Sequence, residues 1–123
     1  MAELRIKTIA ILNTDDVAGA ALMGEIDLDT VAQLRSSLED FETQGVVRVI
    51  LDMHETSYVN SSALAVLVRF ADNYREKGGG IALAGVSSRV KIPFEMLGLL
   101  SYFRFYDTVD AARSSFTDAQ GTV

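Results

Sequence analysis

The sequence has 123 residues, 49% of them hydrophobic and 23% charged, which predicts one folded domain with a single apolar core and excludes a disordered chain. Seventeen acidic residues against eleven basic ones give a net charge of −6, with Lys and Arg scattered along the chain, so we expect no nucleic-acid partner. The sequence contains no cysteine, which excludes disulfides, thiolate zinc sites and cysteine nucleophiles.

The chain begins with a pattern typical of a β-hairpin. Residues 4–12 start with a strand-like alternation of apolar and basic side chains, and the polar residues 13–16 predict a turn. Residues 17–23 form a short apolar segment that predicts a second strand, and residues 24–27 break the strand pattern. We therefore expect two paired strands before the first helix.

A helix and a buried strand follow the hairpin. Asp27 or Asp29 is expected to cap the helix, and Gly45 stands where a C-terminal glycine belongs. Residues 46–53 read V-V-R-V-I-L-D-M, and this nearly continuous apolar run predicts a central strand buried on both faces. Apolar residues at steps of three and four mark the buried side of the helix, namely Val31, Leu34, Leu38 and Phe41.

The second half of the chain predicts three more helices and two more strands. A helix is expected over about residues 62–77, with residues 64, 67, 68, 71 and 75 on one side and three glycines at its end. The remaining expected elements are a strand at 81–86, a short helix from Pro93 to Leu97 that Gly98 closes, a strand at 104–106 and a helix at 109–116.

Strands that alternate with helices predict an α/β fold. We expect a mixed sheet of four to five strands with about four helices packed mainly on one face. The whole chain, residues 1–123, is expected to form a single domain with its core at about 4–116, while the tail at about 117–123 loses apolar periodicity and is expected to fray.

No segment of the sequence is expected to cross a membrane. The longest mostly apolar stretch, residues 63–71, is far shorter than the ~20 residues that a spanning helix needs. The N-terminus also lacks the basic and then apolar regions of a signal peptide. We therefore expect a cytoplasmic protein.

Three features that could indicate an enzyme or a ligand site have simpler structural interpretations. His54 is the single histidine, so it cannot build a standard zinc site, and no G-x-S-x-G elbow provides a serine nucleophile. Residues 78–80 are glycines without the spacing of a phosphate loop. Asp52 follows a buried strand, where open α/β sheets place functional groups, but capping or solvation also explains it. We expect no metal, no cofactor and no enzymatic activity.

The most informative segment joins the strand at 46–53 to the second long helix. Ser61 and Ser62 fall at the start of that helix. A serine there can cap the helix, because its hydroxyl accepts a hydrogen bond from a free backbone N–H. It can also accept a phosphate, since the positive end of the helix stabilises an anion. The residues alone leave both interpretations open.

The sequence resembles a STAS domain of the bacterial anti-sigma factor antagonist type over about residues 4–116, nearly the whole chain. The resemblance implies the STAS fold. The segments that carry it are Gly24-Glu25-Ile26-Asp27-Leu28, Val49-Ile50-Leu51-Asp52-Met53, Tyr58-Val59-Asn60-Ser61-Ser62-Ala63-Leu64, Gly79-Gly80-Ile81-Ala82-Leu83-Ala84-Gly85-Val86, Leu97-Gly98-Leu99 and the segment from Phe103 to Asp107.

The resemblance implies a regulatory role without catalysis. Antagonists of this type bind a GHKL-type serine kinase that is an anti-sigma factor, and so free a sigma factor for transcription. The kinase phosphorylates a serine or threonine in an Asp-Ser-Ser/Thr-Gly-Leu motif, and a phosphatase reverses this. By position, Ser62 is the expected phosphoacceptor and Ser61 the alternative.

Two residues depart from that motif. Asn60 replaces the usual Asp, which keeps the capping ability but removes a charge near the acceptor. Ala63 replaces the usual Gly and adds a methyl group where a kinase is expected to approach.

The expected partner surface is built from the loop at 55–60, the two serines and the exposed side of the second helix. Its residues are Glu55, Thr56, Ser57, Asn60, Ser61, Ser62, Arg69, Asp72 and Asn73. The alternative functions are a STAS module that is not phosphorylated and acts as a scaffold or sensor partner, a component of a lipid-transport complex, and a small hydrolase that uses a serine with His54.

Overall fold

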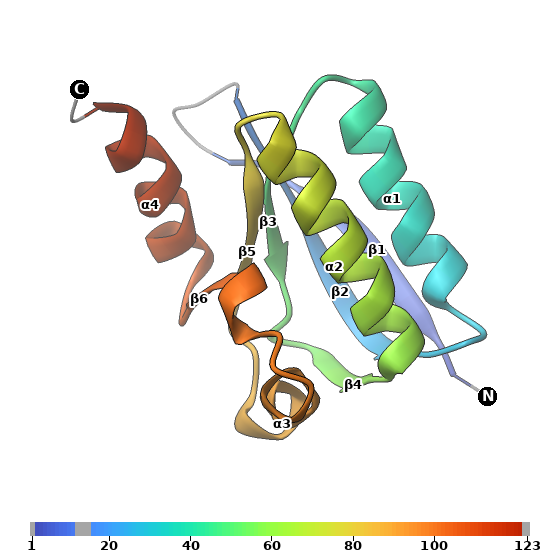
Figure 1. Cartoon of the computed structure of the whole chain (residues 1–123). Coiled ribbons are helices and arrows are strands. Elements are labelled where there is room, and N and C mark those ends of the chain that lie inside the picture. The colour runs from blue at the N-terminus through green and yellow to red at the C-terminus, as the bar shows by residue number, and fades with distance from the viewer. Residues whose placement is uncertain (1, 12–15, 122–123) are drawn as a thin grey trace.

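The computed structural model describes residues 2–11 and 16–121, which form six strands and four α-helices (Figure 1). The strands are β1 (Leu4–Ile9), β2 (Val17–Ile26), β3 (Arg48–Asp52), β4 (Thr56–Val59), β5 (Gly80–Ala84) and β6 (Arg104–Tyr106). The helices are α1 (Val31–Thr43), α2 (Ser61–Glu76), α3 (Ser88–Met96) and α4 (Val109–Gly121), with a 3₁₀ turn at Leu100–Tyr102.

The strands form one mixed sheet in the order β1-β2-β3-β5-β6. The hairpin is confirmed, because β1 and β2 pair antiparallel from Leu4 opposite Gly24 to Ile9 opposite Gly19. The pairs β2–β3, β3–β5 and β5–β6 are parallel, so their carboxyl ends meet at one edge of the sheet. The α/β fold class predicted from the sequence is therefore correct. The predicted end of the first strand, residue 12, and residues 13–15 of the turn predicted at 13–16 lie outside the described residues.

The helices cover the two faces of the sheet unequally. In Figure 1, α1 and α2 lie side by side across one face, and α4 stands apart on the other side of β5 and β6. Val90 and Phe94 of α3 join the large cluster beneath α1 and α2, so three of the four helices pack on that side. A smaller cluster on the opposite face joins Ala112 and Phe116 of α4 to Ile50 and neighbouring strand residues.

Strand β4 and the end of β2 were not expected from the sequence. β2 continues three residues past its predicted end because Gly24, Glu25 and Ile26 pair with β4, which lies beyond the end of β3. Only the first and last residues of β4, Thr56 and Val59, are buried. A four-residue strand with two exposed positions has too short a pattern to separate from a loop.

The predicted cap of α1 is wrong. Thr30 occupies the N-cap position, and its side chain makes no cap hydrogen bond. Its hydroxyl instead donates to the carbonyl oxygen of Glu25 at 2.7 Å. The Asp27 carboxylate accepts from the Asp29 N–H at 2.9 Å, so Asp27 shapes the turn before the helix rather than the helix start itself.

The third helix begins earlier than the sequence predicted, and the fourth ends later. Ser87 caps α3 by accepting a hydrogen bond from the Val90 N–H at 3.2 Å, so the helix starts five residues before Pro93. Pro93 lies inside α3, where it removes one backbone donor. The last helix was expected to end at Phe116 but continues to Gly121.

Helix α2 is held on α1 by a buried tyrosine. The Tyr74 hydroxyl donates to the carbonyl oxygen of Leu38 at 2.6 Å, and burial raises the pKa of this hydroxyl well above its ordinary value. The helix ends as predicted at Gly78, whose φ of +89° lets the N–H of Gly79 reach the carbonyl of Tyr74 at 2.7 Å. The first contact ties α2 to α1, and the second closes the end of α2.

Candidate functional site

The start of α2 is built around Asn60. Its side-chain oxygen accepts a hydrogen bond from the Ala63 N–H at 3.0 Å, and its own N–H donates to the carbonyl oxygen of Ile26 at 3.0 Å. Asn60 is therefore the N-cap, and it also ties the helix to the end of β2. The interpretation of Ser61 or Ser62 as the cap is wrong, because both are already inside the helix.

The cap assignment predicts different costs for two alanine substitutions. Asn60→Ala is expected to lower the free energy of unfolding by about 1 kcal/mol, since it leaves the Ala63 N–H without its acceptor. Ser62→Ala is expected to change it by less than about 0.5 kcal/mol, because no cap is lost. Urea denaturation of the two variants measures the difference, and equal costs would contradict the assignment.

Both serine hydroxyls are available for modification. Ser61 is exposed and Ser62 is half-buried, and neither hydroxyl donates to or accepts from another group in the described part of the chain. The first two N–H groups of the helix have no intrahelical acceptor, and the first turn carries no acidic residue. The positive end of α2 can therefore stabilise an anion attached to either serine.

The departure at Ala63 does not have the expected effect. Ala63 is fully buried, so its methyl group packs in the core rather than on the surface. The expectation that this methyl group faces an approaching kinase is therefore wrong. At the other departure, Asn60 caps the helix with an oxygen that an aspartate would also supply.

An apolar groove runs along α2 from Ser61. It has a volume of about 420 Å³ and lies between one side of α2 and the segment after α3. Leu97 on its wall is 57% exposed, so an apolar side chain faces solvent within the groove. The lining residues are Ser61, Leu64, Ala65, Val68, Arg69, Leu97 and Leu99.

Gly98 shapes the far wall of this groove. Gly98 follows the end of α3 and has a φ of +68°, a conformation that favours glycine. The chain turns there so that the N–H of Leu99 donates a hydrogen bond to the carbonyl oxygen of Phe94 at 2.8 Å. This turn places Leu97 and Leu99 on the same groove wall. Neither leucine was predicted as a site residue, because the short pattern of α3 carries no signal of their place in a groove.

The loop before α2 contributes less surface than predicted. Thr56 is buried, and its hydroxyl donates to the Leu22 carbonyl at 2.7 Å, so its inclusion in the partner surface is wrong. Glu55 and Ser57 are exposed, and the Ser57 hydroxyl donates to the Gly24 carbonyl at 3.3 Å. Tyr58, which was not predicted, exposes 48% of its surface beside them.

The predicted residues on α2 divide between the groove and the rest of the helix. Arg69 lines the groove, and its guanidinium lies 5.2 Å from the centre of the Phe70 ring. Asp72 and Asn73 lie further along α2, outside the groove lining. Asp72 is 3.5 Å from an Arg75 nitrogen. The groove therefore centres the candidate surface on the first half of α2.

His54 lies in a separate cluster at the carboxyl edge of the sheet. One Asp52 oxygen accepts from the His54 backbone N–H at 3.1 Å and contacts Nδ1 of its ring at 2.5 Å. The ring packs so closely on Gly85 that a Cβ at this position would overlap it. In the described residues, no hydrogen bond joins His54 to Ser57, Ser61 or Ser62.

The surroundings of His54 predict a pH-dependent contribution to stability. The hydrogen bond to Asp52 raises the pKa of His54 above its ordinary 6.5, with further help from Asp107. Because the folded pKa is the higher one, the stabilisation is fully present below pH 6.5 and is lost as the pH rises through the folded pKa.

This dependence is measured by comparing the parent with His54→Gln in urea at several pH values. The parent is expected to be more stable than the variant at acidic pH, with a gap that shrinks above neutral pH. Asp52→Asn is the control, and the His54 pKa measured by NMR should fall in it. A stability gap that does not change with pH would contradict the role of the Asp52 contact.

The described residues form neither a metal-binding cluster nor a membrane-spanning helix. No group of three or more His, Asp and Glu side chains among them is placed to hold a metal ion. No helix in the described ranges has the length and apolar character needed to cross a membrane.

Sequence comparisons connect the chain with one family. A family model described as STAS domain matches residues 9–112. The chain is 30% identical over 111 residues to BtrV of Bordetella bronchiseptica, a protein that carries the name of an anti-sigma factor antagonist, with 88% of this chain and 96% of that protein covered. It is 32% identical over 76 residues to the anti-sigma-B factor antagonist of Listeria monocytogenes, with 62% and 67% covered.

A solved protein shares the architecture. The anti-sigma factor antagonist SpoIIAA in its unphosphorylated form matches with a TM-score of 0.73 at 21% identity, over 100% of this chain and 99% of that chain. The phosphorylated form of SpoIIAA, from Bacillus, matches with a TM-score of 0.66 at 20% identity, over 94% and 99%. At these identities the likeness concerns the fold.

Proposed function

This chain belongs to the STAS domain family, and from that premise we propose that it is an anti-sigma factor antagonist. In this role it binds an anti-sigma factor and thereby frees a sigma factor, without catalysing a reaction itself. The proposal is supported by relatives that carry this name and that align over most of both chains. We treat residues 1–123 as one such domain, and the role implies action in the cytoplasm, where sigma factors meet RNA polymerase.

The proposed partner is a GHKL-type serine kinase that phosphorylates the antagonist. The observation that carries this proposal is the pair of free serine hydroxyls at the start of α2, with Ser61 at the rim of an apolar groove. A kinase that docks in the groove meets Ser61 in the groove lining, with Ser62 as the next residue of the same helical turn. A phosphatase would restore the unmodified form.

Phosphorylation at this point opposes docking for a physical reason. A phosphate adds about two negative charges at neutral pH. In the free protein, water and the helix N-terminus stabilise those charges. A partner that covers the groove with apolar side chains removes that water, and a charge without a compensating partner is costly to bury. The modified antagonist therefore releases the anti-sigma factor.

Ser62 is the proposed phosphoacceptor, and Ser61 is the alternative. The position of Ser62 corresponds to the acceptor in the motif that the sequence resembles, and the Asn60 cap leaves its hydroxyl free. Ser61 is more exposed and lines the groove. The two residues therefore need to be separated by experiment.

The test uses the anti-sigma factor kinase encoded in the same organism, with ATP. The expected product carries one phosphate, which peptide mapping by mass spectrometry places on Ser62. Ser62→Ala is expected to block the reaction but keep binding, and Ser61→Ala is the matched control that should still be phosphorylated. Modification of Ser61 alone would contradict the acceptor assignment, and a kinase that neither binds nor modifies the protein would contradict the function.

A further inference from the structure

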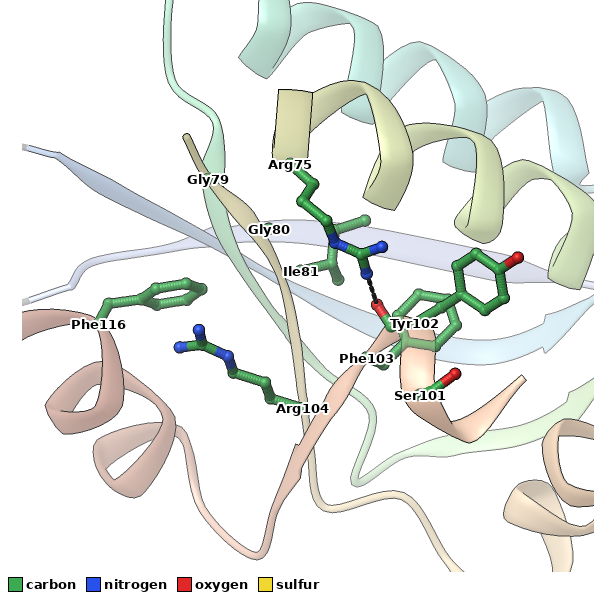
Figure 2. Close-up of a pocket in the computed structure, with 9 residues that line it drawn as sticks. All are labelled: Arg75, Gly79, Gly80, Ile81, Ser101, Tyr102, Phe103, Arg104 and Phe116. Atoms are coloured by element: carbon green, nitrogen blue, oxygen red, sulfur yellow. Dashed lines mark hydrogen bonds between the residues drawn. The ribbon is translucent and has the colours of Figure 1, made fainter. Parts of the chain in front are cut away.

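A second cavity lies at the opposite end of α2 from the serines. It has a volume of about 290 Å³ and sits where α2 ends and where β5 and β6 begin (Figure 2). A helix of 16 residues is about 24 Å long, so this cavity is distinct from the groove. The lining residues are Arg75, Gly79, Gly80, Ile81, Ser101, Tyr102, Phe103, Arg104 and Phe116.

The charge of this cavity is opposite to that of the whole protein. The chain carries a net charge of −6, yet the lining contains two arginines and no carboxylate. Both arginines are exposed to solvent, and each guanidinium lies against an aromatic ring of the lining, so an anion in solution can reach them. The cavity thus has the electrostatic character of an anion site.

Arg75 is held on one side of the cavity. One of its terminal nitrogens donates to the Tyr102 carbonyl oxygen at 3.0 Å, and its guanidinium lies 5.7 Å from the centre of the Tyr102 ring. Its contact with Asp72 is long, at 3.5 Å, and both side chains are about half exposed. A guanidinium has five N–H donors, so Arg75 keeps donors for a ligand after making these contacts.

Arg104 is held on the other side. It pairs in register with Ala82 as the first residue of β6, and its guanidinium lies 5.6 Å from the centre of the Phe116 ring. Among the described residues, no carboxylate forms an ion pair with Arg104. Figure 2 shows the two guanidinium groups on either side of the β5 backbone, directed toward different walls.

We propose that this cavity binds a small dicarboxylate, with one carboxylate on each arginine. A guanidinium binds a carboxylate through two parallel hydrogen bonds, which suits both ends of such a ligand. The separation of the two arginines by β5 favours an extended dianion over a compact one such as phosphate. Ser101 is a further polar residue of the lining, and Tyr102, Phe103 and Phe116 give the cavity apolar walls against which a carbon chain can lie.

The test is isothermal titration calorimetry with glutarate, at constant ionic strength. Butyrate serves as the matched ligand with one carboxylate, and inorganic phosphate as the compact anion. Saturable binding of glutarate is expected, with butyrate and phosphate each at least about tenfold weaker, because each loses the contact with one guanidinium. No saturable binding of glutarate, or equal binding of butyrate or phosphate, would overturn the proposal.

Variants assign the binding to the two arginines. Arg104→Gln and Arg75→Gln are each expected to weaken glutarate binding at least about tenfold, while Arg69→Gln in the groove leaves it unchanged. Arg104→Gln keeps the test valid even if loss of the Tyr102 contact unfolds the Arg75 variant. Unchanged glutarate binding in folded Arg104→Gln would contradict the two-arginine site.

Discussion

Replacing Ala65 with arginine is expected to weaken binding of the anti-sigma factor at least about 100-fold while the fold stays intact. Ala65 is an exposed residue of α2 that lines the apolar groove. A long charged side chain there occupies the volume that an apolar partner residue needs, and docking would have to bury its charge. Arginine has nearly the helix propensity of alanine, so the cost in stability is small.

A matched substitution separates this local effect from the added charge. Ala111 is an exposed alanine on α4, which packs on the opposite face of the sheet. Ala111→Arg makes the same chemical change far from the groove and is expected to bind normally. Dissociation constants for both variants can be measured by surface plasmon resonance. Normal binding by Ala65→Arg would show that the partner uses another surface.

Replacing Gly79 with alanine is expected to destabilise the protein by at least about 3 kcal/mol. A Cβ on Gly79 would overlap the carbonyl oxygen of Val47, which is backbone and cannot rotate away as a side chain can. That same oxygen accepts the Gly80 N–H at 2.8 Å, so moving it disturbs the start of the β3–β5 pairing.

The neighbouring glycine provides the control for this prediction. A Cβ on Gly80 would have open space around it, with nothing within 4 Å. Gly80→Ala is expected to leave stability unchanged or raise it by up to about 1 kcal/mol, because alanine restricts the unfolded chain. Urea denaturation compares the two variants directly. Equal stability of the two variants would contradict the prediction, because it would mean that the Val47 backbone shifts at little energetic cost to make room for the Cβ.

The sequence predicted the elements with long patterns. The hairpin, α1, β3 and α2 follow from apolar spacing over many residues, and the glycines at 78–80 correctly mark the end of α2. All three glycines were predicted to end the helix. Only Gly78 has a positive φ, whereas Gly79 is required by the close approach of Val47. A close approach between distant segments leaves no local signal in a sequence.

The candidate site was predicted only in part, because it too depends on contacts between segments that lie far apart in the sequence. Ser61 and Ser62 were placed correctly at the start of α2, but whether a serine caps the helix was left open, and the structure gives that role to Asn60, one residue earlier. The groove could not be predicted, since Leu97 and Leu99 come from a segment far along the chain from Ala65. Apolar residues that form a surface groove have the same composition as residues that form a core.

The arrangement of the sheet edges has a consequence for aggregation. At one edge of the main sheet path, β1 exposes Arg5 and Lys7 among its apolar residues, and at the other, β6 is only three residues long. An incoming strand from another molecule would have to approach two positive charges at β1 or find too few backbone partners at β6. The protein can therefore keep an exposed apolar groove for its partner while both outer strands disfavour growth of the sheet into fibrils.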